Sequence, residues 1–259
     1  MQHLGLNHRG YAGETIDIQA VLRDGLQAAH RHGWETEPIV VSPELSLLTF
    51  HRSGSRPSQR VYLSTGIHGD EPAGPLAMRQ LLQENRWPGK AELWLCPCLN
   101  PTGFPLNRRE NAQGQDLNRD YRHLQTPEVR AHTTWLARQP AFDLTILLHE
   151  DWEARGFYLY ELNPDRQPSL AETMVAAVAP VCPIDPSPLI EGRSAQGGII
   201  RPDLNPATRP QWPEAFYLVQ TKSRLSYTLE APSDFPLATR VGALVAAVHA
   251  ALNALCARA

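Results

Sequence analysis

Residues 61–71 read VYLSTGIHGDE, an apolar run followed closely by a glycine, a histidine and a glutamate. The run Val61-Tyr62-Leu63 is typical of a buried strand, and Gly66 marks its end. His68 and Glu71, three residues apart, then offer an imidazole nitrogen and a carboxylate oxygen. These are two of the three protein ligands of a typical hydrolytic zinc site. The stretch therefore predicts a strand that ends in a metal-binding loop, although H-x-x-E alone is a weak signal.

The rest of the chain alternates between helix-like and strand-like segments. A helical period of apolar residues is found at residues 15–33, 72–85, 128–138, 170–178 and 237–255, with Thr126 and Pro127 expected to cap and begin the third helix. Strand-like runs lie at residues 38–50 (two pieces around Pro43), 61–65, 92–99, 142–148, 157–161, 216–219 and 225–229. We expect one α/β domain over residues 1–259, with a mixed, mostly parallel twisted sheet flanked by helices.

Composition argues against several classes of protein. Hydrophobic residues make up 42% and charged residues 20% of the chain, which is ordinary for a globular protein. The net charge of −3, without a dense cluster of Lys and Arg, argues against a nucleic-acid surface. The four cysteines form no C-x-x-C pair, and we expect Cys96 and Cys98 to be buried on a strand rather than to serve a redox or metal site. Residues 1–10 lack the order of a signal peptide and no apolar run is long enough to span a membrane, which predicts a cytoplasmic protein without a membrane partner.

Two polar segments interrupt the pattern. Residues 107–121 read NRRENAQGQDLNRDY, and with Arg122 they place four arginines close to two aspartates between apolar strands. Guanidinium groups bind carboxylates in a bidentate manner, so this loop is a candidate substrate-binding loop. Residues 187–213 are rich in Pro, Gly and Arg without periodicity, and we expect a long loop that covers a site or moves.

Two more strand-like runs end in groups that complete a catalytic site. His149 follows the run at 142–148, at the sheet edge where open α/β sheets bind ligands, and it supplies a third metal ligand. Glu230 follows the run at 225–229. Two histidines and one carboxylate leave a zinc position open for water, whose pKa zinc lowers. A nearby carboxylate, Glu230, can take the proton of that water and pass it to a leaving amine. The pattern indicates amide hydrolysis of a substrate that carries a carboxylate.

Four motifs now stand in order: G-x-H-G-D-E, N-P-x-G, R-x-N-A-x-G-x-D-L-N-R and T-L-E. In this order the chain resembles the M14-type zinc metallocarboxypeptidases, with the neighbouring murein peptide amidases and the succinylglutamate desuccinylases and aspartoacylases. The resemblance covers roughly residues 61–230. It implies the zinc carboxypeptidase-like (phosphorylase/hydrolase-like) fold and one zinc ion per chain, held by His68, Glu71 and His149.

The resemblance also implies roles for five further residues. Arg109 corresponds to the arginine that stabilises the oxyanion, and Glu230 to the general base. Asn118 and Arg119 correspond to the pair that binds the terminal carboxylate of the substrate. Asp116 corresponds to the residue that orients the first zinc histidine.

Other assignments stay open at this point. Tyr217 is a candidate for the mobile tyrosine that closes over the substrate in digestive members, but it can equally be a strand residue. Glu214 or Asp203 can select a basic side chain, or be solvated like most loop carboxylates. Asp151 can hold His149 or serve a second metal. His51, His123 and His132 lie outside the motifs, and we interpret them as ordinary histidines.

Three functions remain as alternatives. The first is a carboxypeptidase acting on peptides with a free carboxylate. The second is an N-acyl amino acid hydrolase of the succinylglutamate desuccinylase or aspartoacylase type, whose members usually add a β-rich domain after the catalytic glutamate. Residues 231–259 read mainly as a helix, so the first is favoured. The third is a non-enzymatic binding module, which the complete catalytic set argues against.

Overall fold

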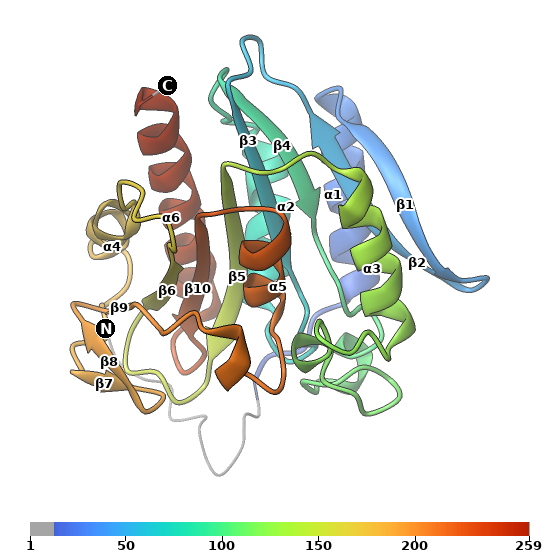
Figure 1. Ribbon diagram of the computed structural model, residues 1–259. Coiled ribbons are helices and arrows are strands. Elements are labelled where there is room, and N and C mark those ends of the chain that lie inside the picture. Colours follow the sequence, from blue (N-terminus) through green and yellow to red (C-terminus); the bar gives the residue numbers. More distant parts are fainter. Residues whose placement is uncertain (1–12, 259) are drawn as a thin grey trace.

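One mixed sheet of ten strands organises the protein in a computed structural model that describes residues 13–258 (Figure 1). The prediction about a signal peptide concerns residues 1–10 and lies outside this part. In their order across the sheet, the strands are β1 (Glu35–Ser42), β2 (Leu45–Arg52), β4 (Ala91–Cys96), β3 (Gln59–Thr65), β5 (Leu144–Asp151), β10 (Ser226–Pro232), β6 (Tyr158–Leu162), β9 (Ile199–Ile200), β8 (Arg193–Gln196) and β7 (Leu189–Ile190).

The centre of the sheet is parallel. Strands β4, β3, β5 and β10 run in the same direction, while the pairings outside them are antiparallel except that of β6 with β9. The predicted mixed sheet is confirmed, with its parallel part mainly confined to the middle. Because β3, β5 and β10 are neighbours and parallel, their carboxyl ends meet at one edge.

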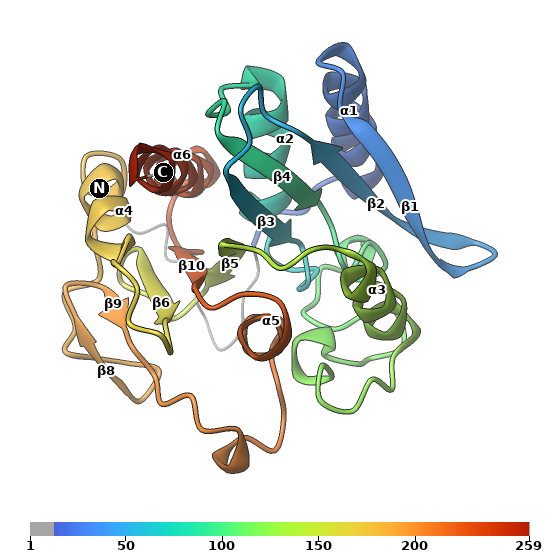
Figure 2. The same ribbon diagram turned by 45° about the horizontal axis from the view of Figure 1, so that its top comes forward.

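Helices cover both faces of this sheet, as Figure 2 shows. Alternate side chains of a strand point to opposite faces, so Leu63 and Ile146 enter one apolar cluster while Tyr62 and Leu147 enter the other. On the first face lie α1 (Ile18–Arg31), α2 (Ala73–Glu84), α4 (Ala171–Val178) and α6 (Leu237–Arg258). On the second lie α3 (Pro127–Arg138) and α5 (Glu214–Thr221). The fold is that of a three-layer α/β protein.

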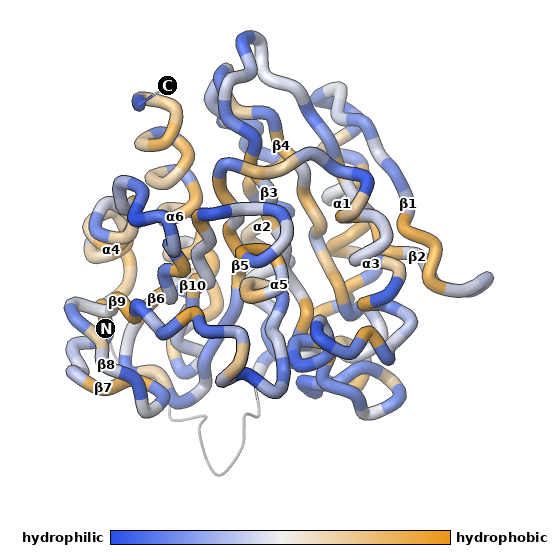
Figure 3. Tube along the Cα trace, in the orientation of Figure 1, coloured by the Kyte–Doolittle hydropathy of each residue, from blue (hydrophilic) through white to orange (hydrophobic). Residues whose placement is uncertain are grey.

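Helix α6 is a core helix. Among the helices of residues 13–258, α6 alone is long and apolar enough to cross a membrane by length and composition. However, 56% of its most apolar window is buried inside the protein, where it packs against α2 and α4. Figure 3 shows apolar residues along this helix and hydrophilic ones in many of the loops at the lower edge of the sheet.

Most predicted elements are present within a few residues of their expected bounds, but the strand predicted at residues 216–219 is wrong. These residues belong to helix α5. A short apolar run does not distinguish a strand from a buried helix, and here Pro213 precedes the helix while Ala215, Phe216, Leu218 and Val219 are all buried. A helix can bury residues that follow one another in this way when the core surrounds it on most sides.

Two further expectations need correction in part. Residues 187–213 are not one continuous loop, because they contain β7, β8, β9 and a 3₁₀ turn at Pro206–Thr208. These strands are too short to give a period-2 signal in the sequence. Thr126 does occupy the position before α3, with Pro127 as the first helical residue, but its side chain makes no capping hydrogen bond. Its hydroxyl instead donates to Asp120 at 2.8 Å.

A buried arginine ties α6 to the sheet and to α2. Arg240 of α6 is fully buried, and its guanidinium pairs with Glu150 of β5 and with Glu14. The second oxygen of Glu150 accepts a hydrogen bond from the backbone N–H of Ala73 in the first turn of α2. That helix has no side-chain cap of its own, so Glu150 satisfies one of its unpaired N–H groups.

We predict that Arg240→Met lowers the free energy of unfolding by about 3–5 kcal/mol, because it leaves the Glu150 carboxylate buried without its cation. Arg258→Met is the control, since Arg258 is exposed at the end of the same helix and, among residues 13–258, donates only to the carbonyls of Pro168 and Ser169. Its cost should stay below about 1 kcal/mol. Chemical denaturation measures the free energy of unfolding of both variants. A similarly small decrease in the two variants would contradict the prediction.

Candidate metal centre and substrate cavity

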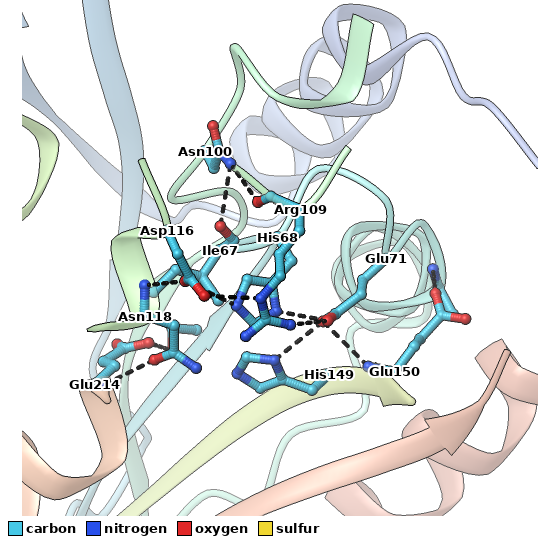
Figure 4. Close-up of polar contacts among 12 residues, drawn as sticks. Ile67, His68, Glu71, Asn100, Arg109, Asp116, Asn118, His149, Glu150 and Glu214 are labelled. Atoms are coloured by element: carbon cyan, nitrogen blue, oxygen red, sulfur yellow. Dashed lines mark hydrogen bonds and ion pairs between the residues drawn. The ribbon is translucent and has the colours of Figure 1, made fainter. Parts of the chain in front are cut away.

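The three predicted metal ligands converge at the carboxyl ends of β3 and β5. His68 lies in the loop after β3, Glu71 lies just before α2, and His149 lies near the end of β5. Their ligand atoms all fall within 4.8 Å of one another, and all three residues are buried. Nδ1 of His68 is 2.5 Å from Oε1 of Glu71, and Nδ1 of His149 is 3.0 Å from Oε2 (Figure 4). Both imidazoles therefore point the same ring nitrogen at one carboxylate.

The loop that carries His68 is held by the N-P-x-G turn. Asn100 Nδ2 donates to the carbonyl oxygens of Ile67 and Arg109, at 3.2 and 3.3 Å. Its Oδ1 accepts the backbone N–H of Gly103 at 3.0 Å. Gly69 lies so close to this turn that a Cβ atom there would be 2.2 Å from the carbonyl carbon of Gly103. Glycines are thus required where the two loops touch.

Charged neighbours surround the first histidine. Nε2 of His68 lies 3.4 Å from Oδ1 of Asp116, outside hydrogen-bond geometry, while Oδ2 of Asp116 accepts from Nε of Arg109 at 2.8 Å. Burial alone would lower the pKa of His68, but the Glu71 carboxylate raises it above its usual value. Burial would raise the pKa of Asp116, yet His68 and Arg109 hold it well below its usual range. Asp116 is therefore ionised beside the His68 ring.

Glu71 is the anionic centre of the cluster. Burial would raise the pKa of its carboxyl group, but His68 and His149 hold that pKa well below the usual range. Its Oε2 also accepts the backbone N–H of Glu150 at 3.2 Å. Two imidazole nitrogens and a carboxylate are the donor set of a catalytic zinc site. Because these atoms converge in a buried position, the residues present fit a zinc ion.

Glu230 faces the same space from the neighbouring strand. It lies on β10, directly opposite His149 of β5 in the parallel register, so both side chains are on the same face of the sheet. Burial raises the pKa of Glu230 well above its usual value, and the nearby Glu71 carboxylate raises it further. A proton acceptor at the metal cluster has the place that a general base needs.

A cavity of about 490 Å³ joins these groups. His68, Glu71, His149 and Glu230 line it, together with Arg109, Asn118 and Arg119 from the polar loop. Away from the cluster, the cavity runs along the sheet face that α5 covers. Its apolar wall consists of Leu147, Leu162, Ala215 and Phe216.

Asn118 and Arg119 are held in different ways. Oδ1 of Asn118 accepts the backbone N–H of Glu214 at 2.9 Å, and its own backbone N–H donates to Asp116. Arg119 is exposed, and its guanidinium donates to the carbonyl oxygen of Asn118 at 2.9 Å. A fixed amide and a guanidinium with further free donors make a suitable site for a carboxylate.

Within residues 13–258, Asp151 forms no hydrogen bond or ion pair with His149. Its carboxylate accepts hydrogen bonds from the Tyr158 hydroxyl and from the backbone N–H of Glu153. Burial raises the pKa of Asp151 to about 6. The structure therefore gives no support to Asp151 as the partner of His149, although the side chain does line the cavity.

The candidates for a mobile lid and for selection of the substrate side chain do not line the cavity. Tyr217 is in helix α5 rather than on a loop, its ring is 5.6 Å from that of Tyr121, and it is not among the cavity-lining residues. Glu214 is 1% exposed and turned away from the cavity. Asp203 is exposed outside the cavity and accepts the backbone N–H of Asn205.

The histidines outside the motifs have other partners, as expected. His51 lies between the carboxylates of Glu35 and Glu92, and His132 is buried between two tyrosine hydroxyls. His123 lies 3.1 Å from the carbonyl oxygen of Pro210.

Sequence reasoning missed several residues of the site. Glu150 supports Glu71 through its backbone and pairs with Arg240 on the far side of the sheet. The alternation of a strand was a usable signal for Glu150, because it places Glu150 on the face opposite His149. Arg193 and Arg209 line the cavity but come from the segment without periodicity, so no pattern in the sequence singled them out.

Comparison with known proteins connects this geometry to a family. The profile of the succinylglutamate desuccinylase/aspartoacylase catalytic domain matches residues 57–184, which include all three candidate metal ligands. Carboxypeptidase SOL1 of Arabidopsis thaliana is 34% identical over 111 residues, and the match covers 32% of this chain and 21% of that protein. Carboxypeptidase 2 of Trichophyton rubrum is 32% identical over 114 residues, covering 40% of this chain and 21% of that one. The match thus spans about a fifth of each relative.

Solved structures share the fold over most of the chain. A protein from Shewanella denitrificans that is classed as a metallopeptidase has a TM-score of 0.80 at 21% identity, and the match covers 96% of this chain and 98% of that one. A metallo-carboxypeptidase from Pseudomonas aeruginosa, solved with (2-guanidinoethylmercapto)succinic acid, has a TM-score of 0.66 at 22% identity, with 91% and 68% covered. The chain is thus similar in sequence to the desuccinylase/aspartoacylase catalytic domain and to carboxypeptidases, and similar in fold to metallopeptidases. The metal cluster, the polar loop and Glu230 all open onto one cavity.

We predict that Gly69→Ala lowers the free energy of unfolding by at least about 2 kcal/mol and weakens zinc binding, because the added methyl group meets the backbone of Gly103. Gly25→Ala is the matched control, since a Cβ at this position of helix α1 is 3.5 Å from its nearest neighbour, Cδ1 of Leu82 in α2, which is a normal contact. Denaturation and zinc titration of both variants test this. Full stability and unchanged zinc affinity in Gly69→Ala would show that the two loops are not in close contact.

Proposed function

We propose that this protein is a zinc-dependent metallocarboxypeptidase that hydrolyses the last amide bond of peptides with a free terminal carboxylate. One observation carries the proposal. A buried His-Glu-His cluster, the carboxylate of Glu230 and the carboxylate-binding groups Asn118 and Arg119 line one cavity. These parts correspond to the needs of amide hydrolysis, which are a polarised carbonyl, a proton acceptor and a fixed substrate.

His68, Glu71 and His149 would hold the zinc ion, which when bound polarises a carbonyl group and lowers the pKa of water. Asn118 and Arg119 bind the terminal carboxylate and thereby place the last amide bond near the cluster. Glu230 takes a proton from the attacking water and passes it to the leaving amine. Arg109 lies beside Glu71, with Nη1 at 3.8 Å from Oε1, where its positive charge stabilises the oxygen anion that develops on the carbonyl.

The charges of the cavity support a substrate with more than one anionic group. Arg119, Arg193 and Arg209 line the cavity, and within residues 13–258 none of them forms an ion pair with a carboxylate. The guanidinium of Arg209 lies 4.7 Å from the ring centre of Phe216, and burial together with Arg193 lowers its pKa. Arg119 is used by the terminal carboxylate, so the other two favour an acidic over a basic side chain at the last residue.

An N-acyl amino acid hydrolase is the second candidate. The match to the succinylglutamate desuccinylase/aspartoacylase profile favours it, whereas the curated relatives named carboxypeptidases favour peptides. Both reactions break an amide bond next to a terminal carboxylate, so the same site residues serve either. The acyl side of the substrate decides between them. A cytoplasmic location stays a prediction of the sequence.

Glu230→Gln is expected to keep zinc and to lose activity by about 100- to 10,000-fold, because the amide cannot accept the proton. Elemental analysis of the purified variant measures zinc, and steady-state kinetics measure kcat. Unchanged turnover would remove Glu230 from the mechanism. Loss of zinc together with activity would show that Glu230 supports the cluster instead.

A panel of short peptides and N-acyl amino acids tests the reaction itself. Each peptide is offered with a free and with an amidated terminus, and with Glu, Gln, Leu or Lys as its last residue, in the presence and absence of a chelator. We expect chelator-sensitive release of the last residue from free-acid peptides, fastest with Glu. Cleavage of the acyl amino acids alone would establish the second candidate, and equal cleavage of amidated peptides would contradict the carboxylate site.

In the same panel, Arg119→Gln should raise KM for free-acid substrates by roughly tenfold, the loss expected of one charge-assisted hydrogen bond at an accessible position. Arg130→Gln is the control, because Arg130 is exposed on α3 and, in the described part of the chain, donates only to the carbonyls of Leu124 and Gln125. An equal rise in KM in both variants would show that it follows from the loss of positive charge in general and not from the position of Arg119.

A further inference from the structure

A carboxylate without a cationic partner is buried directly behind the substrate cavity. Glu214, the first residue of α5, is 1% exposed and forms no ion pair with any Lys or Arg in the described part of the chain. Burial of such a group is costly unless hydrogen bonds replace its water. Two hydroxyl groups of β3 do so, since Tyr62 donates to Oε1 at 3.0 Å and Ser64 donates to Oε2 at 2.9 Å.

These bonds continue through a chain of polar groups. The Tyr62 hydroxyl also lies 2.9 Å from Nε2 of His132, whose Nδ1 lies 2.8 Å from the Tyr121 hydroxyl. Burial lowers the pKa of His132 to about 3, so its ring is neutral and carries one N–H. When Glu214 is ionised, one order of protons satisfies every group: Tyr121 donates to Nδ1, Nε2–H donates to Tyr62, and Tyr62 donates to Glu214. In that state the chain presents hydroxyl hydrogens to the carboxylate.

The backbone of Glu214 reaches the substrate site. Its N–H donates to Oδ1 of Asn118 at 2.9 Å, as Figure 4 shows. Only the oxygen of an amide side chain accepts such a bond, so the orientation of the Asn118 amide is fixed by it. The amino group Nδ2 is the end that remains, and among residues 13–258 it has no hydrogen-bond partner. Asn118 thus offers a free donor to the cavity because of where α5 begins.

We propose that Glu214 is a positioning residue, whose buried carboxylate fixes the first turn of α5 to β3 so that its N–H orients Asn118 toward the terminal carboxylate of the substrate. This rests on the proposed function. Pro213 and Ala215, on either side of Glu214, line the cavity, so the same anchor also fixes this part of its wall. Strand β3 also leads directly to His68. The same strand therefore positions both the carboxylate-binding groups and the metal cluster.

The test compares Glu214→Gln with Glu161→Gln. Glu161 is the matched control because it is also a buried glutamate that accepts a bond from a tyrosine hydroxyl, Tyr227, yet it does not line the cavity. Glutamine has one acceptor oxygen instead of two, so only one of the Ser64 and Tyr62 hydroxyls can still donate to it. We expect KM for free-acid peptides to rise by roughly five- to tenfold in Glu214→Gln, with kcat within about twofold, and amidated peptides unaffected. Glu161→Gln should change neither constant.

Two outcomes would overturn the proposal. One is an unchanged KM in Glu214→Gln, and the other is a fall in kcat without a change in KM. If Glu214→Gln fails to fold, Ser64→Ala replaces it, because it removes only one of the two donors. If the wild-type protein cleaves no peptide, the proposed function fails. Calorimetric binding of free-acid and amidated dipeptides by the same variants then decides the role of Glu214 separately.

A second readout tests the burial of the carboxylate. The groups that face Glu214 are Tyr62 and Ser64 of β3, Cys96 of β4, His132 of α3, and Asn118 and Tyr121 of the polar loop. Burial raises the pKa of Glu214 to about 7, against a usual value of 4.5. The wild type therefore loses stability as pH rises from about 4.5 through about 7, relative to a variant without this group. Glu214→Gln should gain in stability relative to the wild type over this range, and the opposite trend would contradict the geometry.

Discussion

The convergence of two histidine Nδ1 atoms on the carboxylate of Glu71 is the interaction on which the site depends. It requires β3 and β5 to be adjacent and parallel, because only then do the loop after β3 and the end of β5 meet at one edge. Register matters equally, since a shift by one residue would turn His149 to the opposite face. The buried core on both faces of the sheet fixes this register.

Such a concentration of buried charge is stable only because each group is compensated. Glu71 lies between two imidazoles, Asp116 between His68 and Arg109, and Glu150 beside Arg240. The compensated groups are divided between the two faces of the sheet. Side chains on the α3 and α5 face open to the cavity, whereas the side chains of Glu150 and Arg240 are buried and pair with each other on the other face. The sheet thus separates the side chains that face the cavity from this supporting ion pair.

The motif residues and the α/β alternation were predictable from the sequence because their signals are local. Strand ends, a glycine at a turn and short spacings such as that of His68 and Glu71 can be recognised without knowledge of the fold. Helix α5 was not predictable, because a four-residue apolar run has no period to distinguish helix from strand. Arg240 and Arg209 were missed, and Glu214 was considered only for side-chain selection, for a different reason. Their roles depend on partners at least 90 positions away for Arg240 and Glu214, and on a cavity wall for Arg209.

The central claim is that the three converging residues bind zinc. Diffraction from crystals of the zinc-loaded protein at the zinc absorption edge tests it most directly, because anomalous scattering locates the metal independently of any assumed mechanism. One anomalous peak is expected, at bonding distance from Nδ1 of His68, Nδ1 of His149 and the carboxylate of Glu71. Zinc found only at other positions, or no peak in the cavity, would contradict it.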